Sequence, residues 1–158
     1  MLFRSATQTA ASVTVAYPIS FNNTDPNSNQ VSIVAGNQIT FAQSGTYNLQ
    51  YSVQFTNTDT GSPTNVNIWF RKNDTGSTGD IPDSASQFTV PAAHGGVHGQ
   101  LIGSINYIVE TNAGDYFQLM WQTEALTTYL ETIPAGTSPT TPVSPCVIFT
   151  ATPIVSTV

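Results

Sequence analysis

Two histidines are the side chains with the clearest capacity to bind a metal ion. His94 and His98 are four residues apart, a spacing that turns both toward one ligand position only on a helix. Gly95, Gly96 and the preceding Pro91 disfavour a helix here. Two histidines also supply only two ligands, so a complete site would need a third group or symmetry-related copies meeting at an axis. The alternative is a glycine-rich mobile loop, and we expect no metal site.

The carboxylates offer one pair that acid/base catalysis could use. Glu124 and Glu131 bracket a loop, and a glycosidase needs two carboxyl groups roughly 5–10 Å apart across a cleft. No fixed scaffold is evident between them, so this interpretation is weak. Most of the other carboxylates stand beside Gly, Pro, Asn or Thr in expected turns, where Asp bonds its own backbone: Asp25, Asp59, Asp74, Asp80, Asp83 and Asp115.

The single cysteine, Cys146, begins the apolar run Cys146-Val147-Ile148-Phe149, which predicts a buried and inert thiol. The sequence has no Gly-x-Ser-x-Gly elbow, phosphate-binding loop or Cys-x-x-Cys pair. We therefore expect a protein that is not an enzyme and that has no cofactor.

Charge is scarce along the chain. Only 8% of the 158 residues are Asp, Glu, Lys or Arg, against roughly 25% in typical globular proteins. With three basic residues and a net charge of −6, the chain cannot neutralise a row of phosphates or an anionic membrane surface. We therefore expect neither nucleic acid nor a membrane surface as a partner. The 39% hydrophobic content is still sufficient for a folded core.

The apolar pattern predicts an all-β fold. Short stretches of alternating apolar residues are separated by Gly, Pro, Asn and Asp, and no sustained helical periodicity occurs. The expected strands are residues 13–17, 31–34, 38–42, 46–56, 65–71, 87–90, 101–111, 115–124 and 146–152. They are sufficient for a two-sheet antiparallel sandwich. We expect one domain over residues 21–158, preceded by an N-terminal arm or first strand at residues 1–20.

The order of four short motifs gives a resemblance to a known family. The motifs are Gly45-Thr46-Tyr47, Ile68-Trp69-Phe70-Arg71-Lys72-Asn73, Ile81-Pro82-Asp83-Ser84 and Ala113-Gly114-Asp115-Tyr116. Over about residues 37–155 the chain resembles the jelly roll of the tumour-necrosis-factor-like and complement globular-head superfamily, and above all small proteins of tailed phages with the same signatures. The resemblance implies a homotrimer in which one sheet of each subunit packs against its neighbours around a three-fold axis. It also implies that the strands after Gly45 and after Gly114 both belong to that inner sheet.

On this basis we assign a trimer interface to the second faces of two strands. In residues 46–56 the large apolar side chains alternate with small neutral ones, and residues 115–124 are apolar enough on both faces to be covered on both. Neutral amides suit a face that a neighbour covers, because they exchange hydrogen bonds without the desolvation cost of unpaired charges. The interface candidates are Asn48, Gln50, Gln54, Tyr116, Gln118, Met120 and Gln122. The alternative is that these faces meet water in a chain generally poor in charge.

Two long irregular segments, residues 91–99 and 125–145, are candidates for recognition because loops carry function on rigid scaffolds. The second is the stronger candidate, with Tyr129, Thr137, Ser138, Thr140 and Thr141 as the expected contact residues.

The expected function is that of a non-enzymatic virion structural protein of a tailed phage, as a trimeric capsid decoration, cement or fibre-type protein. Its partners would be other virion proteins of the capsid or tail, and a host-surface glycan is a further candidate. We detect no signal peptide, so synthesis in the host cytoplasm and assembly into the virion are expected. The alternative function is a carbohydrate-binding or host-receptor-binding module, because sandwich loops with Tyr, Asn and Asp can bind sugars.

Overall fold

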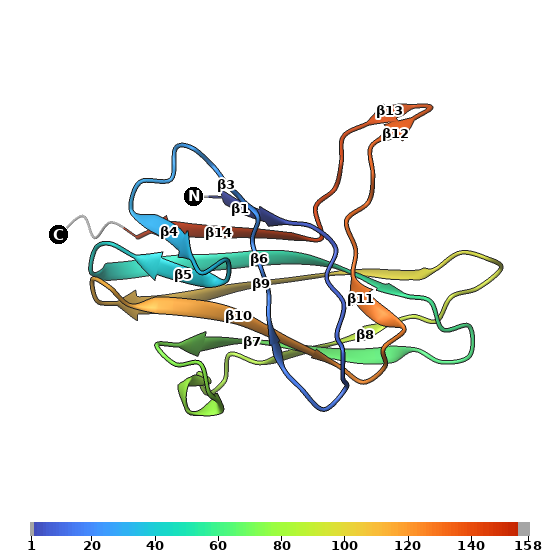
Figure 1. Cartoon of the computed structure of the whole chain (residues 1–158), viewed down its shortest axis with the longest axis horizontal. Helices are drawn as coiled ribbons and strands as arrows, with labels where there is room; N and C mark the ends of the chain where they lie inside the picture. Colours follow the sequence, from blue (N-terminus) through green and yellow to red (C-terminus); the bar gives the residue numbers. More distant parts are fainter. Residues whose placement is uncertain (1, 155–158) are drawn as a thin grey trace.

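Two antiparallel β-sheets pack face to face in the computed structural model, which describes residues 2–154 (Figure 1). Sheet A has the order β9 (Gly99–Thr111), β6 (Gly45–Asn57), β14 (Val147–Pro153), β1 (Leu2–Ser5) and β3 (Asn23–Thr24), and β11 (Thr128–Leu130) also pairs with β6. Sheet B has the order β4 (Val31–Val34), β5 (Gln38–Phe41), β10 (Tyr116–Thr123), β7 (Thr64–Lys72) and β8 (Ser86–Val90), and β2 (Tyr17–Pro18) also pairs with β10. The predicted all-β sandwich is confirmed.

Three further elements are small. A 3₁₀ turn, η1 (Ser77–Gly79), follows β7, and a two-stranded sheet is formed by β12 (Gly136–Thr137) and β13 (Thr140–Thr141). β12 and β13 stand away from the sandwich at the end of a long hairpin (Figure 1).

The predicted strands coincide with observed ones except for residues 13–17, of which only Tyr17 lies in a strand. The Ser12 hydroxyl accepts a hydrogen bond from the Thr14 backbone N–H at 3.2 Å, which turns the chain locally, and Val13 and Val15 are exposed. The prediction of a strand at residues 13–17 was therefore wrong. Residues 1–20 were expected to hold an N-terminal arm or first strand, but β1 was not among the expected strands, because four residues without alternation carry little signal.

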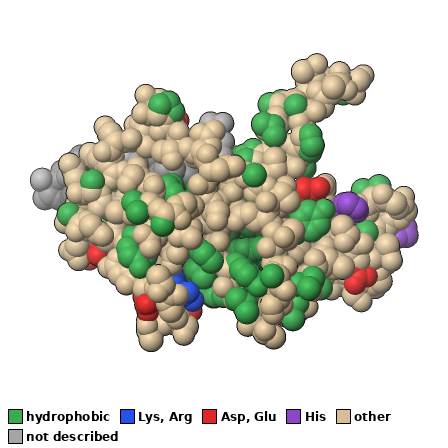
Figure 2. All heavy atoms as spheres, in the orientation of Figure 1, with side chains coloured by type: hydrophobic (Ala, Val, Ile, Leu, Met, Phe, Trp, Pro, Cys, Tyr) green, Lys and Arg blue, Asp and Glu red, His purple; other side chains and the backbone are tan. Residues whose placement is uncertain are grey.

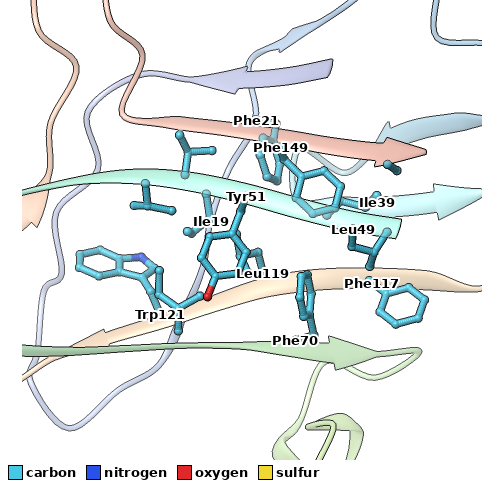
Figure 3. Packing of buried hydrophobic residues seen from close by; sticks show 14 of the residues in the cluster. Ile19, Phe21, Ile39, Leu49, Tyr51, Phe70, Phe117, Leu119, Trp121 and Phe149 are labelled. Atoms are coloured by element: carbon cyan, nitrogen blue, oxygen red, sulfur yellow. The ribbon is translucent and has the colours of Figure 1, made fainter. Parts of the chain in front are cut away.

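The core lies between the two sheets and follows from the alternation of β6. Tyr47, Leu49, Tyr51, Val53 and Phe55 are all buried, as expected. Each side chain of this size contributes about 1.5–3 kcal/mol when fully buried, as an upper bound. They meet aromatic residues of sheet B; the rings of Tyr51 and Phe70, for example, lie 6.0 Å apart edge to face (Figure 3).

The N-terminal residues are part of the same packed unit. The chain runs from sheet A to sheet B after β1, with the Gln8 backbone N–H bonded to Leu130 O at 2.9 Å and the Ile19 N–H bonded to Leu119 O at 2.8 Å. Ile19 and Phe21 are buried in the core. Residues 6–22 therefore close one side of the sandwich.

The burial of Tyr51 predicts a weakness at alkaline pH. Desolvation raises the pKa of Tyr51 from 10.0 to about 12, an effect that Ser86 offsets only in part. Because the folded pKa lies above the unfolded one, this contribution is fully present below pH 10 and is lost as the pH rises toward 12. We expect the free energy of unfolding to fall by about 1.4 kcal/mol per pH unit in this range. Tyr51→Phe should remove that slope in urea titrations; an unchanged slope would contradict the assignment.

Candidate interaction surface

Two of the sequence motifs meet in space and brace one end of sheet B. Asp115 accepts hydrogen bonds from the Asn73 side-chain amide at 2.7 Å and from the Asn112 backbone N–H at 2.8 Å, and it pairs with the Lys72 ammonium at 2.7 Å. Asn73 Oδ1 in turn accepts the Tyr116 backbone N–H at 2.8 Å. These residues lock the end of β7 to the start of β10, so their role is structural.

The other two motifs are also structural. The Ser84 hydroxyl accepts a hydrogen bond from the Phe70 N–H at 3.0 Å and donates to Ile81 O at 2.8 Å, which holds the segment after η1 against β7. Tyr47 packs edge to face on Phe41, with ring centroids 4.7 Å apart. Residues of all four motifs thus stabilise the fold.

Groups that could do chemistry are dispersed. His94 and His98 are exposed, and His94 exchanges two backbone hydrogen bonds with Val97 in a tight turn. Within residues 2–154, no three His, Cys, Asp or Glu side chains gather as metal ligands would. The Cys146 thiol is buried, as predicted, and burial raises its pKa, which disfavours the reactive thiolate.

The outer face of sheet A is broad and neutral. Along β6, β9 and β14 the only charged residue is Glu110, near the end of β9. Gln50 and Asn106 are opposite each other in the register and exposed, and within the described chain neither side chain has a hydrogen bond. Asn48 Oδ1 also lacks a hydrogen-bond donor, but this oxygen is buried and is not open to a partner. The side-chain amides of Gln50 and Asn106 therefore remain free to bond a partner.

Isoleucines interrupt this polar face. Ile102 is 63% exposed, and Ile108 and Ile148 are exposed as well. They stand opposite Gln54, Asn48 and Ser52 of β6 in the register, so all three project from the outer face. Their exposure was not predicted from the sequence. The pattern of β9, apolar at Leu101, Ile102, Ile105 and Ile108, was a usable signal because it places apolar residues on both faces of the strand.

The outer face of sheet B satisfies its own amides. The Asn67 amide donates to Gln122 Oε1 at 3.0 Å, and Gln87 donates to Asn67 Oδ1 at 3.2 Å, which forms a ladder across three strands. Gln118 donates to Asn37 Oδ1 at 2.9 Å. This face has little unsatisfied hydrogen-bonding capacity to offer a neighbour.

Two of the expected interface residues, Met120 and Gln118, are already covered within the single chain. Met120 is 2% exposed and Gln118 is 5% exposed within the single chain, and Met120 pairs with Pro18 of β2. The chain's own segments cover them, so they present almost no surface to another copy. Tyr116 and Gln122 are half-buried on the same strand.

The expectation that both interface strands share one sheet was also wrong. β6 lies in sheet A and β10 lies in sheet B, so Asn48, Gln50 and Gln54 face away from Gln118 and Gln122. The chain crosses between the sheets several times, as from β6 to β7 and from β8 to β9, and the polar pattern of each strand does not reveal which sheet it enters.

The expected recognition segment, residues 125–145, is a strand followed by a projecting hairpin. Tyr129 lies in β11, paired with Thr56 and half-buried, and so is not a loop residue. Thr137, Ser138, Thr140 and Thr141 are exposed at the tip of residues 133–144, which we call the hairpin. Figure 2 shows hydrophobic side chains along its legs.

Two shallow hollows lie where the hairpin leaves sheet A. One, of about 260 Å³, is lined by residues that include Gln54, Gln100, Ile102, Glu131 and Ile133. The other, of about 290 Å³, is lined by Ser52, Gln54, Ile102, Val143, Ser144, Pro145 and Ile148. The hairpin base and the outer face of sheet A thus form one continuous surface.

Comparison with protein-family models and with curated protein sequences finds no match to this chain. Within the described residues, no helix has the length and apolar character needed to cross a membrane.

The Asp115 brace predicts a loss of stability in acid. Burial alone would raise the pKa of Asp115, but the Asn112 N–H, Lys72 and Asn73 together lower it from 3.8 to about 2. Because the folded pKa is depressed, the contribution is present above about pH 4 and is lost as the pH falls toward 2. Discounted for solvent screening, it amounts to about 1–2 kcal/mol.

Asp115→Asn should therefore lower the free energy of unfolding at pH 7 and flatten its decline between pH 4 and pH 2. Urea titrations at several pH values measure both effects. Asp83→Asn, in an exposed turn, is the matched control. Equal pH profiles for the Asp115 variant and the unsubstituted protein would contradict the role of the brace.

Proposed function

We propose that this protein is a non-enzymatic structural component of a phage virion, a capsid decoration or fibre-type protein that assembles as a homotrimer. The observation that carries the assembly part is the outer face of sheet A, where amides without hydrogen-bond partners surround exposed isoleucines. A neutral, partly apolar face of this kind suits burial against another protein surface. The virion part rests on the resemblance of the four motifs to tailed-phage proteins.

The order of the strands supports a jelly roll of the tumour-necrosis-factor-like type. Eight strands count in chain order as β1, β5, β6, β7, β8, β9, β10 and β14. In sheet A the first pairs with the eighth, the eighth with the third and the third with the sixth. In sheet B the second pairs with the seventh, the seventh with the fourth and the fourth with the fifth. Two interleaved Greek keys give this order.

A second candidate function is carbohydrate binding, and one observation favours it. The hollow at the hairpin base places the half-buried Glu131 beside the amides of Gln54 and Gln100. Carboxylates and amides are the groups that hydrogen-bond sugar hydroxyls. The hollow is small and open, and so would hold one sugar unit of a host-surface glycan at most.

Light scattering coupled to size exclusion tests the assembly. We expect a single species of three times the 16.8 kDa monomer mass at micromolar concentration. A monomer at all concentrations up to about 100 µM would overturn the trimer, because stable assemblies dissociate only below that range.

The virion assignment is tested separately, by mass spectrometry of purified phage particles. The protein should be present at a copy number that is a multiple of three. Its absence from particles, together with binding of the isolated protein on a glycan array and loss of that binding in Glu131→Gln, would favour the carbohydrate-binding alternative.

A further inference from the structure

The hairpin is rooted firmly in sheet A. β14 pairs with residues 47–53 of β6, and β11 pairs with residues 55–57, so the hairpin leaves the sheet at the gap beside Gln54. Gln54 fixes both legs: its side-chain amide donates to Pro145 O at 2.9 Å, and its backbone carbonyl accepts the Glu131 N–H at 3.0 Å. The direction of the hairpin is therefore set by the sheet.

Beyond this base the hairpin makes no hydrogen bond to the rest of the described chain. The hydrogen bonds of residues 134–143 are all internal to the hairpin, and all of these residues except the half-buried Gly136 are exposed. In Figure 1 the hairpin stands clear of the sandwich. A two-stranded hairpin alone is marginally stable in water, so this one gains its ordering free energy from elsewhere.

The surface of the hairpin is apolar and neutral. Val143 is 56% exposed, Ile133 is also exposed, and prolines stand at positions 134, 139, 142 and 145. The sequence contains no charged side chain after Glu131. Exposed apolar side chains on a projecting, uncharged element are typical of a segment that a partner covers.

The outer face of sheet A has the matching character. It presents Ile102, Ile108 and Ile148 among neutral amides and hydroxyls, and the two hollows beside Ile102 offer room for an apolar side chain. Apart from Glu110 and Glu131, neither surface carries a charge, so contact requires little desolvation of unpaired ions. The free amides of Gln50 and Asn106 can bond the backbone groups of a strand laid across them.

The dimensions also agree. Each leg runs about five or six residues beyond the base, which at about 3.3 Å per residue gives a reach of roughly 15–20 Å. A five-stranded sheet with strands about 4.8 Å apart is roughly 20 Å wide. The hairpin is thus long enough to cross the outer face of one sheet A. In the single chain it does not lie across its own face, because its legs leave the sheet and stand clear of the sandwich (Figure 1).

We propose that the hairpin of each copy packs across the outer face of sheet A of the next copy. Residues 133–144 are one half of this contact, and the face around Ile102, Ile108 and Ile148 is the other half. The two halves differ, so the contact is heterologous and a three-fold rotation closes it into a ring. This inference rests on the proposed homotrimer and names the surfaces that hold it together.

Two variants test the two halves. The first replaces residues 135–142 with an Asn-Gly turn, which shortens the hairpin and preserves the Ile133–Ser144 bridge. The second is Ile102→Lys, which places a charge on the receiving face without disturbing the core. The matched control is Val34→Lys, an exposed residue of sheet B. The first two variants should fold and melt as isolated chains, and the control should keep the melting temperature of the unsubstituted trimer.

Size exclusion with light scattering measures the assembly of each variant. The first two variants should remain monomers at concentrations at least about 30-fold above those at which the unsubstituted trimer forms. An affinity loss of that size is expected when a hot-spot contact is removed. The control should remain a trimer. Mixing the two variants should produce a 1:1 heterodimer, because the hairpin of one still meets the intact face of the other.

Other outcomes would overturn the inference in distinguishable ways. A shortened variant that remains trimeric would show that the hairpin lies outside the trimer contact, while the trimer itself stands. If that trimer also failed to enter phage particles, the hairpin would bind another virion protein instead. An unsubstituted protein that is monomeric at about 100 µM would overturn both the trimer and the hairpin contact.

Discussion

The strict alternation of β6 is the constraint on which the rest of the structure depends. Tyr47, Leu49, Tyr51, Val53 and Phe55 fill the space between the sheets, and the residues between them must therefore lie on the outer face of sheet A. β6 is also the strand that pairs with β9 along its whole length and with β14 and β11 on its other edge. The core, the neutral outer face and the root of the hairpin are thus all fixed by one strand.

A chain with so little charge carries neutral amides on its surface instead. The two sheets differ in how the hydrogen bonds of these amides are satisfied. On sheet B, Asn67 links Gln122 to Gln87, and the chain's own N-terminal segment covers part of β10. On sheet A, Gln50 and Asn106 have no such bonds within the described residues. The bonds on sheet B thus support the single chain, and on the proposed function sheet A is the face that associates.

Much of the fold could be predicted from the sequence, because alternation and turn residues act locally. The core face of β6 and the burial of Cys146 follow from the pattern alone. The sheet to which each strand belongs does not, since it depends on pairing between distant segments such as β1 and β14. For the same reason the cover over Met120 was missed: it is supplied by β2, about a hundred residues away in the chain. The hairpin tip was correctly expected to be exposed, but Tyr129 was not expected in a strand.

The central claim is that one copy's hairpin lies on another copy's sheet A, and intermolecular cross-linking tests it most directly. A photoreactive benzoyl-phenylalanine replaces Thr140 at the hairpin tip, and light and ¹⁵N-labelled copies are unfolded, mixed, refolded together and irradiated. We predict cross-linked peptide pairs of mixed isotopic label that join the hairpin to β9 or β14. Cross-links that join only peptides of the same label, or none to these strands in a preparation that is trimeric, would contradict the account.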